Sequence, residues 1–180
     1  MARNAWTVLS LAIFGILAVL VGCSSEEDRV EPLCQPDQFV IGEEPGPGEF
    51  VAGYASSELF FTRTSEFVSA SGPHGDVRIW YSKNIEELID NMCFIVPEGT
   101  TAIKEEDFSG SGEVEAMVLM IKKDDAYDPE NNNWYYEQLD EKGDPTGDES
   151  DRGKIGSCID CHSQFADFDY LGGTKLKSGE

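Results

Sequence analysis

Apolar and polar residues alternate along the middle of the chain, a pattern typical of β-strands with one buried face. The clearest case places Val77, Ile79 and Tyr81 on one face of a strand. Residues 114–122 are instead apolar on both faces, which predicts a strand buried on both sides. The strand segments are residues 76–82, 100–104, 114–122 and 134–139. Turn residues separate them, so an antiparallel sheet is expected.

Two segments have helical character. Ser82 or Asn84 can cap a short helix that carries Leu88, Ile89 and Met92. The segment around residues 158–162, near the C-terminus, predicts a second helix. The expected fold class is therefore α+β, a mainly antiparallel β-sheet with a few helices and a helix at the C-terminal end.

The N-terminal segment has the pattern of an export signal. Arg3 precedes an apolar run over residues 8–21, which is too short for a comfortable membrane span. The run ends in residues 20–23, Leu-Val-Gly-Cys, which resemble a bacterial lipobox in which Cys23 is lipidated. An ordinary signal with a coincidental cysteine is the alternative. No aspartate follows Cys23, so we expect a lipid anchor on the periplasmic side of the envelope, in the outer membrane.

Composition divides the remainder into two parts. Residues 23–49 are rich in acid, proline and glycine and predict a tether, whereas residues 50–180 have enough apolar residues for one domain. The formal net charge of −22 makes nucleic acid an improbable partner, because phosphates would be repelled. The acids of residues 140–154 do not have the spacing of a calcium-binding EF-hand loop, so a solvated loop is expected.

The chain has five cysteines, and their positions suggest different roles. With Cys23 assigned to lipid, Cys158 and Cys161 belong to a C-terminal motif, which leaves Cys34 and Cys93. In an oxidising compartment such a pair commonly forms a disulfide, and the alternative is two unrelated thiols.

The motif Cys158-Ile159-Asp160-Cys161-His162 is the pattern of covalent haem attachment. On a helix the two cysteines lie about 4.5 Å apart along the axis, one turn from each other. Their thiols can then form thioether bonds with the haem vinyl groups, while His162 binds the iron. A redox dithiol lacks its βαβ context here, and a zinc site lacks further ligands at the usual spacing. One covalently bound haem c is therefore expected, on a haem-bearing C-terminal helix.

The other side of the iron has weaker candidates. His74 lies in a Gly/Pro loop, where exposure to solvent is expected. Met92, Met117 and Met120 could each supply a sulfur ligand, but all three lie in apolar patterns typical of core packing. The sequence therefore favours a five-coordinate iron with an open, apolar ligand site.

Several segments together resemble the cytochrome P-460 family, which includes the cytochromes c′-beta. The resemblance extends over residues 50–170, about two thirds of the chain, and rests on residues 71–78, 97–105, 118–122, 128–129, 134–136 and 158–162. It implies a mostly antiparallel β fold, often dimeric, with one haem c.

The two branches of this family imply different functions. In cytochromes P-460 a lysine is also bonded to the porphyrin, and the enzyme oxidises hydroxylamine or related nitrogen compounds; the matching residue is Lys104. The position of the distal carboxylate of those enzymes falls near Val118, so this chain has no acid there. The resemblance therefore favours the c′-beta branch, which binds nitric oxide or carbon monoxide. A nitrogen-oxidising enzyme and an electron carrier with a periplasmic partner remain the alternatives.

Overall fold

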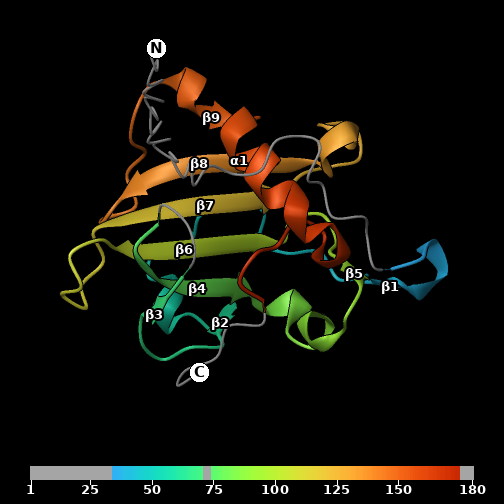
Figure 1. The fold of residues 1–180 in the computed structure, drawn as a ribbon, viewed down its shortest axis with the longest axis horizontal. Helices are drawn as coiled ribbons and strands as arrows, with labels where there is room; N and C mark the ends of the chain where they lie inside the picture. The colour runs from blue at the N-terminus through green and yellow to red at the C-terminus, as the bar shows by residue number, and fades with distance from the viewer. Residues whose placement is uncertain (1–33, 71–73, 175–180) are drawn as a thin grey trace, which may run out of the picture.

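The computed structural model describes residues 34–70 and 74–174, and its main feature is a seven-stranded sheet (Figure 1). The strand order is β2-β4-β6-β7-β8-β9, and β3 also pairs with β4. All pairs in this sheet are antiparallel. The strands are β2 (Phe60–Thr62), β3 (Val68–Ser69), β4 (Asp76–Ser82), β6 (Thr101–Asp107), β7 (Ala116–Lys122), β8 (Trp134–Asp140) and β9 (Arg152–Gly153).

The remaining elements are short. β1 (Val40–Ile41) and β5 (Phe94–Ile95) form a separate parallel pair. The helix α1 (Gly156–His162) continues into the 3₁₀ segment η8 (Ser163–Phe168). Further 3₁₀ turns are η2 (Pro36–Gln38), η3 (Tyr54–Ser56), η4 (Lys83–Ile85), η5 (Leu88–Asp90), η6 (Pro129–Asn131) and η7 (Glu149–Asp151). The predicted α+β class, mainly antiparallel with a C-terminal helix, is confirmed.

The sheet has an apolar cluster on each face. On one face Tyr81, Met120 and Tyr136 pack beneath α1 and η8, which cross the sheet in Figure 1. On the other face Ile103 and Leu119 pack with residues of the chain before β4. β7 contributes to both clusters, which is why its sequence is apolar on both faces.

The helix expected after β4 is absent; η4 and η5 occupy this part of the described chain. The side chain of Ser82, expected to cap a helix, instead accepts the backbone N–H of Thr101 at 2.9 Å and donates to Asn84 at 2.7 Å. The amide of Lys83 donates to the carbonyl of Leu59 at 2.7 Å. Because these groups are bound to the sheet and to β2, only isolated 3₁₀ turns form.

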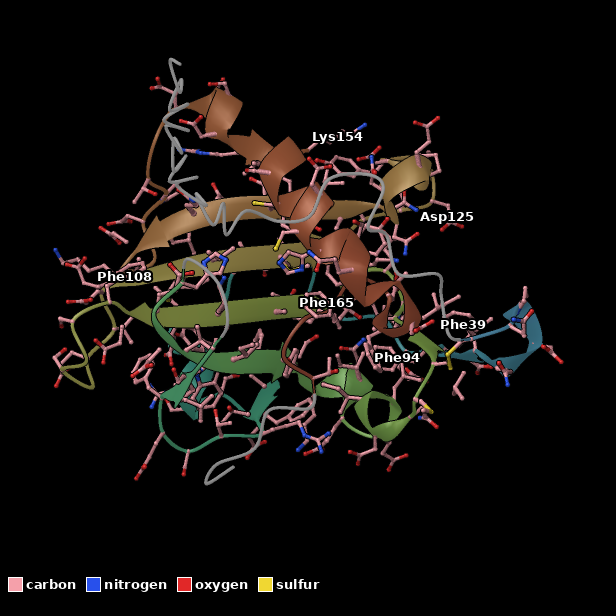
Figure 2. The ribbon with its side chains drawn as sticks, viewed as in Figure 1. Phe39, Phe94, Phe108, Asp125, Lys154 and Phe165 are labelled. Atoms are coloured by element: carbon pink, nitrogen blue, oxygen red, sulfur yellow. A yellow bond between two sulfur atoms is a disulfide. The ribbon has the colours of Figure 1, made fainter. Side chains whose placement is uncertain are left out.

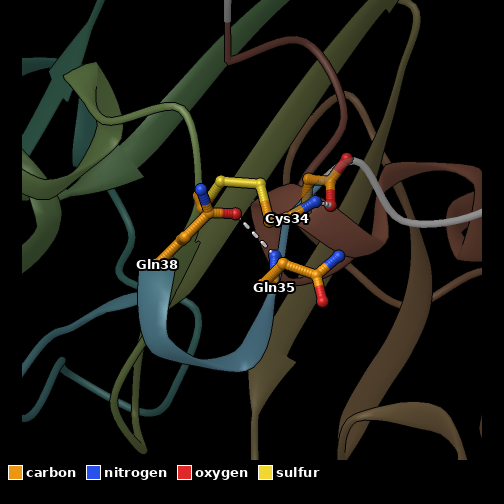
Figure 3. The surroundings of a disulfide bond; sticks show 5 residues. Cys34, Gln35 and Gln38 are labelled. Atoms are coloured by element: carbon orange, nitrogen blue, oxygen red, sulfur yellow. Dashed lines mark hydrogen bonds between the residues drawn. A yellow bond between two sulfur atoms is a disulfide. The ribbon is translucent and has the colours of Figure 1, made fainter.

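The second half of the expected tether is bound to the domain. Cys34 and Cys93 form a disulfide (Figure 3), with their Cα atoms 6.2 Å apart. The amide of Val40 donates to the carbonyl of Cys93 at 3.0 Å, and Gly48 donates to Gly99 at 2.8 Å. The packed part of the chain therefore begins well before residue 50, since residues 34–49 already contact β5 and the turn that follows it.

A buried ion pair fastens the C-terminal segment to the sheet. The ammonium of Lys122, on β7, lies 2.7 and 2.8 Å from the two carboxylate oxygens of Asp169. Asp169 also accepts the amide of Val96 at 2.9 Å, and its carbonyl accepts the indole N–H of Trp134 at 2.7 Å. The segment after η8 is thus joined at one point to β7, to β8 and to the residue that follows β5.

Candidate functional site

α1 carries the cysteine and histidine motif, as the sequence predicted. The motif's residues 158–162 all lie in this helix, which begins at Gly156 and ends at His162. Cys158 and Cys161 are both free thiols, and burial raises the pKa of Cys158. Cys158 packs against the apolar cluster beneath the helix, while Cys161 and His162 line a cavity.

The His162 ring is held by a specific hydrogen bond. Its Nδ1 lies 2.7 Å from the backbone carbonyl of Tyr170, which assigns the ring proton to Nδ1. Tyr136 and Phe165 pack against the ring, with centroids at 5.5 and 6.0 Å. Burial lowers the pKa of His162 to about 4, so the imidazole is neutral at neutral pH. Its Nε2 therefore keeps the lone pair that a metal ion binds.

A tight turn brings this carbonyl to the histidine. Asp169 and Tyr170 have φ values of 48° and 65°, in the left-handed region, where aspartate is tolerated better than most residues. The amide of Tyr170 donates back to the carbonyl of Phe165 at 2.9 Å. The buried ion pair of Asp169 with Lys122 fixes the turn, so the fold itself orients His162.

The cavity lies between the sheet and the C-terminal segment and has a volume of about 520 Å³. Figure 2 shows Phe165 between the helical segment and the strands. Ligand and cofactor pockets commonly have volumes of this size. Its sheet wall is formed by Val77, Ile79, Ala102, Lys104, Val118 and Met120, and facing it are Cys161, His162, Phe165, Phe168 and Leu171.

Strand register places Val118 and Lys104 side by side in the sheet wall. Lys104 of β6 is the pairing partner of Val118 on β7 and of Ile79 on β4. Paired residues of antiparallel strands point to the same face. Val118 and Lys104, selected on sequence grounds, thus both line the cavity that contains His162.

The cavity also has a charged corner, although the sequence predicted an apolar ligand site. A carboxylate oxygen of Glu106 lies 2.7 Å from Nδ1 of His74 and 3.0 Å from the ammonium of Lys104. Burial alone would raise the pKa of Glu106, but His74 and Lys104 hold it below its usual value. Burial lowers the pKa of Lys104, and Glu106 opposes that shift. The site is therefore partly polar: Lys104 and His74, both considered from the sequence, meet Glu106, which the sequence analysis did not name.

Glu106 is the residue that sequence reasoning missed. It follows Lys104 by two positions, so the two side chains share a face of β6. His74 reaches it because β4 pairs with β6 so that Val77 is opposite Glu106. The alternation along β6 could have indicated Glu106, but the approach of His74 depends on register.

The three methionines have different environments. Met92 is 70% exposed, and Met117 packs on the other face of the sheet, where Tyr54 donates to its sulfur at 3.2 Å. Met120 lines the cavity. Of the three, Met120 alone shares a cavity with His162.

These residues fit a covalently held haem. The two thiols lie one turn apart on α1, and the neighbouring imidazole has its Nδ1 bonded and its Nε2 unprotonated. The hydroxyl of Tyr136, beside the His162 ring, is buried and has no hydrogen-bond partner within residues 34–70 and 74–174. A buried hydroxyl of this kind commonly hydrogen-bonds a bound group.

No protein-family model matches the chain, and no curated protein matches its sequence. In the described part of the chain, no cluster of three or more His, Cys, Asp or Glu side chains is arranged to hold a bare metal ion. None of the helices described is both long and apolar enough to cross a bilayer.

Proposed function

We propose that this protein is an exported c-type haem protein that binds a small ligand such as nitric oxide. Cys158 and Cys161 hold the haem by thioether bonds, and His162 is its protein iron ligand. The haem supplies an iron coordination position to which a small ligand can bind. The resemblance to the cytochrome P-460 family supports this proposal, and within that family the c′-beta branch is favoured.

The observation that carries the proposal is the hydrogen bond between Nδ1 of His162 and the carbonyl of Tyr170, at 2.7 Å. Iron-binding histidines commonly donate their second ring nitrogen to a carbonyl, which fixes the ring and its tautomer. This histidine adjoins two thiols and lines a cavity of about 520 Å³. A histidine that only stabilises a helix requires neither two neighbouring thiols nor a cavity beside its ring.

The sheet wall favours a small, weakly polar ligand. Ile79, Ala102 and Val118 present only apolar atoms to the cavity. Nitric oxide and carbon monoxide bind haem iron without hydrogen bonds from the protein, so such a wall does not impede them. Val118 stands where a distal carboxylate is expected in the nitrogen-oxidising branch.

One observation favours the enzyme as a second candidate. Lys104 lines the cavity and is largely buried, with a pKa lowered by that burial. A buried lysine is more readily neutral, and therefore more nucleophilic, than an exposed one. A lysine–haem cross-link at Lys104 would support a hydroxylamine- or nitric oxide-oxidising activity.

Covalent attachment is tested on protein matured in a bacterial periplasm. Haem should stay with the polypeptide in a denaturing gel and in intact-mass spectra. Extraction of the haem by acid-acetone would contradict the proposal. The ferrous absorption spectrum separates the two candidates, because an ordinary high-spin Soret band indicates the ligand binder and a strongly red-shifted band indicates the Lys104 cross-link.

Membrane anchoring is a separate part of the proposal, because Cys23 lies outside the described residues. We expect acylation of Cys23 on the periplasmic side of the outer membrane. Cys23→Ser should move the protein from the membrane fraction to the soluble periplasmic fraction, since a lipid anchor is then lost. A variant that stays in the membrane fraction would contradict the lipobox.

A further inference from the structure

In the charged corner of the cavity, the basic side chains and the carboxylate differ in whether they line the cavity. Lys104 and His74 line the cavity, whereas Glu106 is not among its lining residues. The Glu106 side chain is only 7% exposed and contacts the side chains of both residues through the same oxygen. The cavity lining thus presents the two basic groups, and the Glu106 carboxylate contacts them from a position beside Lys104 on the same face of β6.

Glu106 does not use the full hydrogen-bonding capacity of Lys104. An ammonium has three N–H donors and no acceptor, and its ion pair with Glu106, at 3.0 Å, can occupy at most one of them. Within the described residues, Lys104 has no second ion-pair partner. The neighbours of Lys104 on the adjacent strands are Ile79 and Val118, which have no polar side-chain atoms to receive the other donors.

The apolar surroundings of Lys104 strengthen its interactions with other charges in the cavity. The walls around Lys104 are largely apolar, so solvent screens its charge less than at the surface. The chain as a whole has a net charge of −22, so the basic group Lys104 in the cavity wall contrasts with the negative charge of the rest of the protein. A neutral diatomic ligand would gain less from this charge than an anion would.

We infer that Lys104, positioned by Glu106, makes the sheet side of the cavity a binding site for a small monovalent anion at the haem iron. This inference rests on the proposed haem function and adds a class of ligand to it. The ammonium donates hydrogen bonds to the anion, while Ile79 and Val118 limit its size. Azide is a suitable probe, and carbon monoxide is the neutral reference ligand.

The experiment compares azide binding to the ferric protein with carbon monoxide binding to the ferrous protein. In Lys104→Met, the ratio of azide affinity to carbon monoxide affinity should fall at least about tenfold, because the charge interaction is lost. Lys104→Arg keeps the charge and should keep most of that ratio. Glu106→Gln should raise the ratio about threefold, because it removes a negative charge beside Lys104 while its amide oxygen can still accept from the ammonium.

The surface pair Lys83 and Glu86 provides matched controls. Its atoms lie 2.6 Å apart, and its side chains are 53% and 45% exposed. Lys83→Met changes the protein charge as Lys104→Met does, and Glu86→Gln changes it as Glu106→Gln does. Both control variants should leave the ratio within about twofold.

Three results would overturn the inference. A ratio that Lys104→Met does not change would show that the ammonium does not contact the anion. A loss in Glu106→Gln as large as that in Lys104→Met would show that the ion pair merely orders the cavity wall. A red-shifted Soret band would show that Lys104 is bonded to haem and has no ammonium. Absence of covalent haem would instead overturn the proposed function, and this inference with it.

Discussion

Replacing Cys158 and Cys161 together with alanine should remove all haem from the denatured polypeptide. Both thiols lie on α1 beside the cavity, and no other thiol is available on this helix to form a thioether bond. The matched control is Cys34→Ala with Cys93→Ala, which also removes two cysteines but from the disulfide. Haem staining of a denaturing gel, normalised to protein, measures the outcome.

The two double variants should differ in the property that they lose. The variant without the disulfide should keep covalent haem but unfold more easily, by about 2–5 kcal/mol, because a native cross-link is lost. Single replacements of Cys158 or Cys161 should each leave one thioether bond. Equal loss of haem staining in both double variants would show that staining reports folding rather than attachment, and it would contradict the assignment.

The second large effect is expected at the buried ion pair of Lys122 and Asp169. Lys122→Met should lower the free energy of unfolding by about 3–5 kcal/mol, because it leaves the Asp169 carboxylate buried without its cation. The two side chains are only 9% and 1% exposed, so water cannot replace the lost partner. Urea denaturation of the mature protein measures the change.

Two further variants test whether loss of the ion pair causes the expected decrease in the free energy of unfolding. Lys142→Met removes a lysine that is 73% exposed, and it should cost less than about 1 kcal/mol. Asp169→Asn tolerates the same left-handed backbone, so the double variant Lys122→Met with Asp169→Asn should lose less than the two single losses added together. A loss below about 1 kcal/mol in Lys122→Met would contradict a stabilising role. Additive losses in the double variant would show that the two residues act independently.

The strands could be predicted because their signal is local. Val77 and Tyr81 alternate with polar residues and are almost completely buried, with 1% exposure each. The pattern of β7 also indicated burial on both faces, which Leu119 and Met120 satisfy from opposite sides. The helix expected after β4 was wrong because the cap residue Ser82 binds the sheet instead, and that choice depends on tertiary contacts.

The candidate site could be predicted only in part, because some of its features follow from local sequence and others depend on tertiary contacts. The spacing of the cysteine and histidine motif requires one helix face, which follows from local geometry. The carbonyl of Tyr170 comes from a turn with positive φ at two residues other than glycine, which has no strong sequence signal. The meeting of His74 with Glu106 depends on the register of β4 against β6, and residues so far apart in sequence give no local pattern.

The disulfide joins the two cysteines that come first in the part of the chain after Cys23, an order that has a consequence for the export that we propose. Four cysteines allow three fully paired connectivities, and two of these would consume both motif thiols in wrong bonds. A chain secreted from its N-terminus delivers Cys34 and Cys93 to the oxidising compartment before Cys158. Early closure of this bond leaves the late-arriving thiols without a nearby protein thiol except each other. If the protein carries the haem that we propose, the order of its cysteines along the chain would keep the last two free for that cofactor.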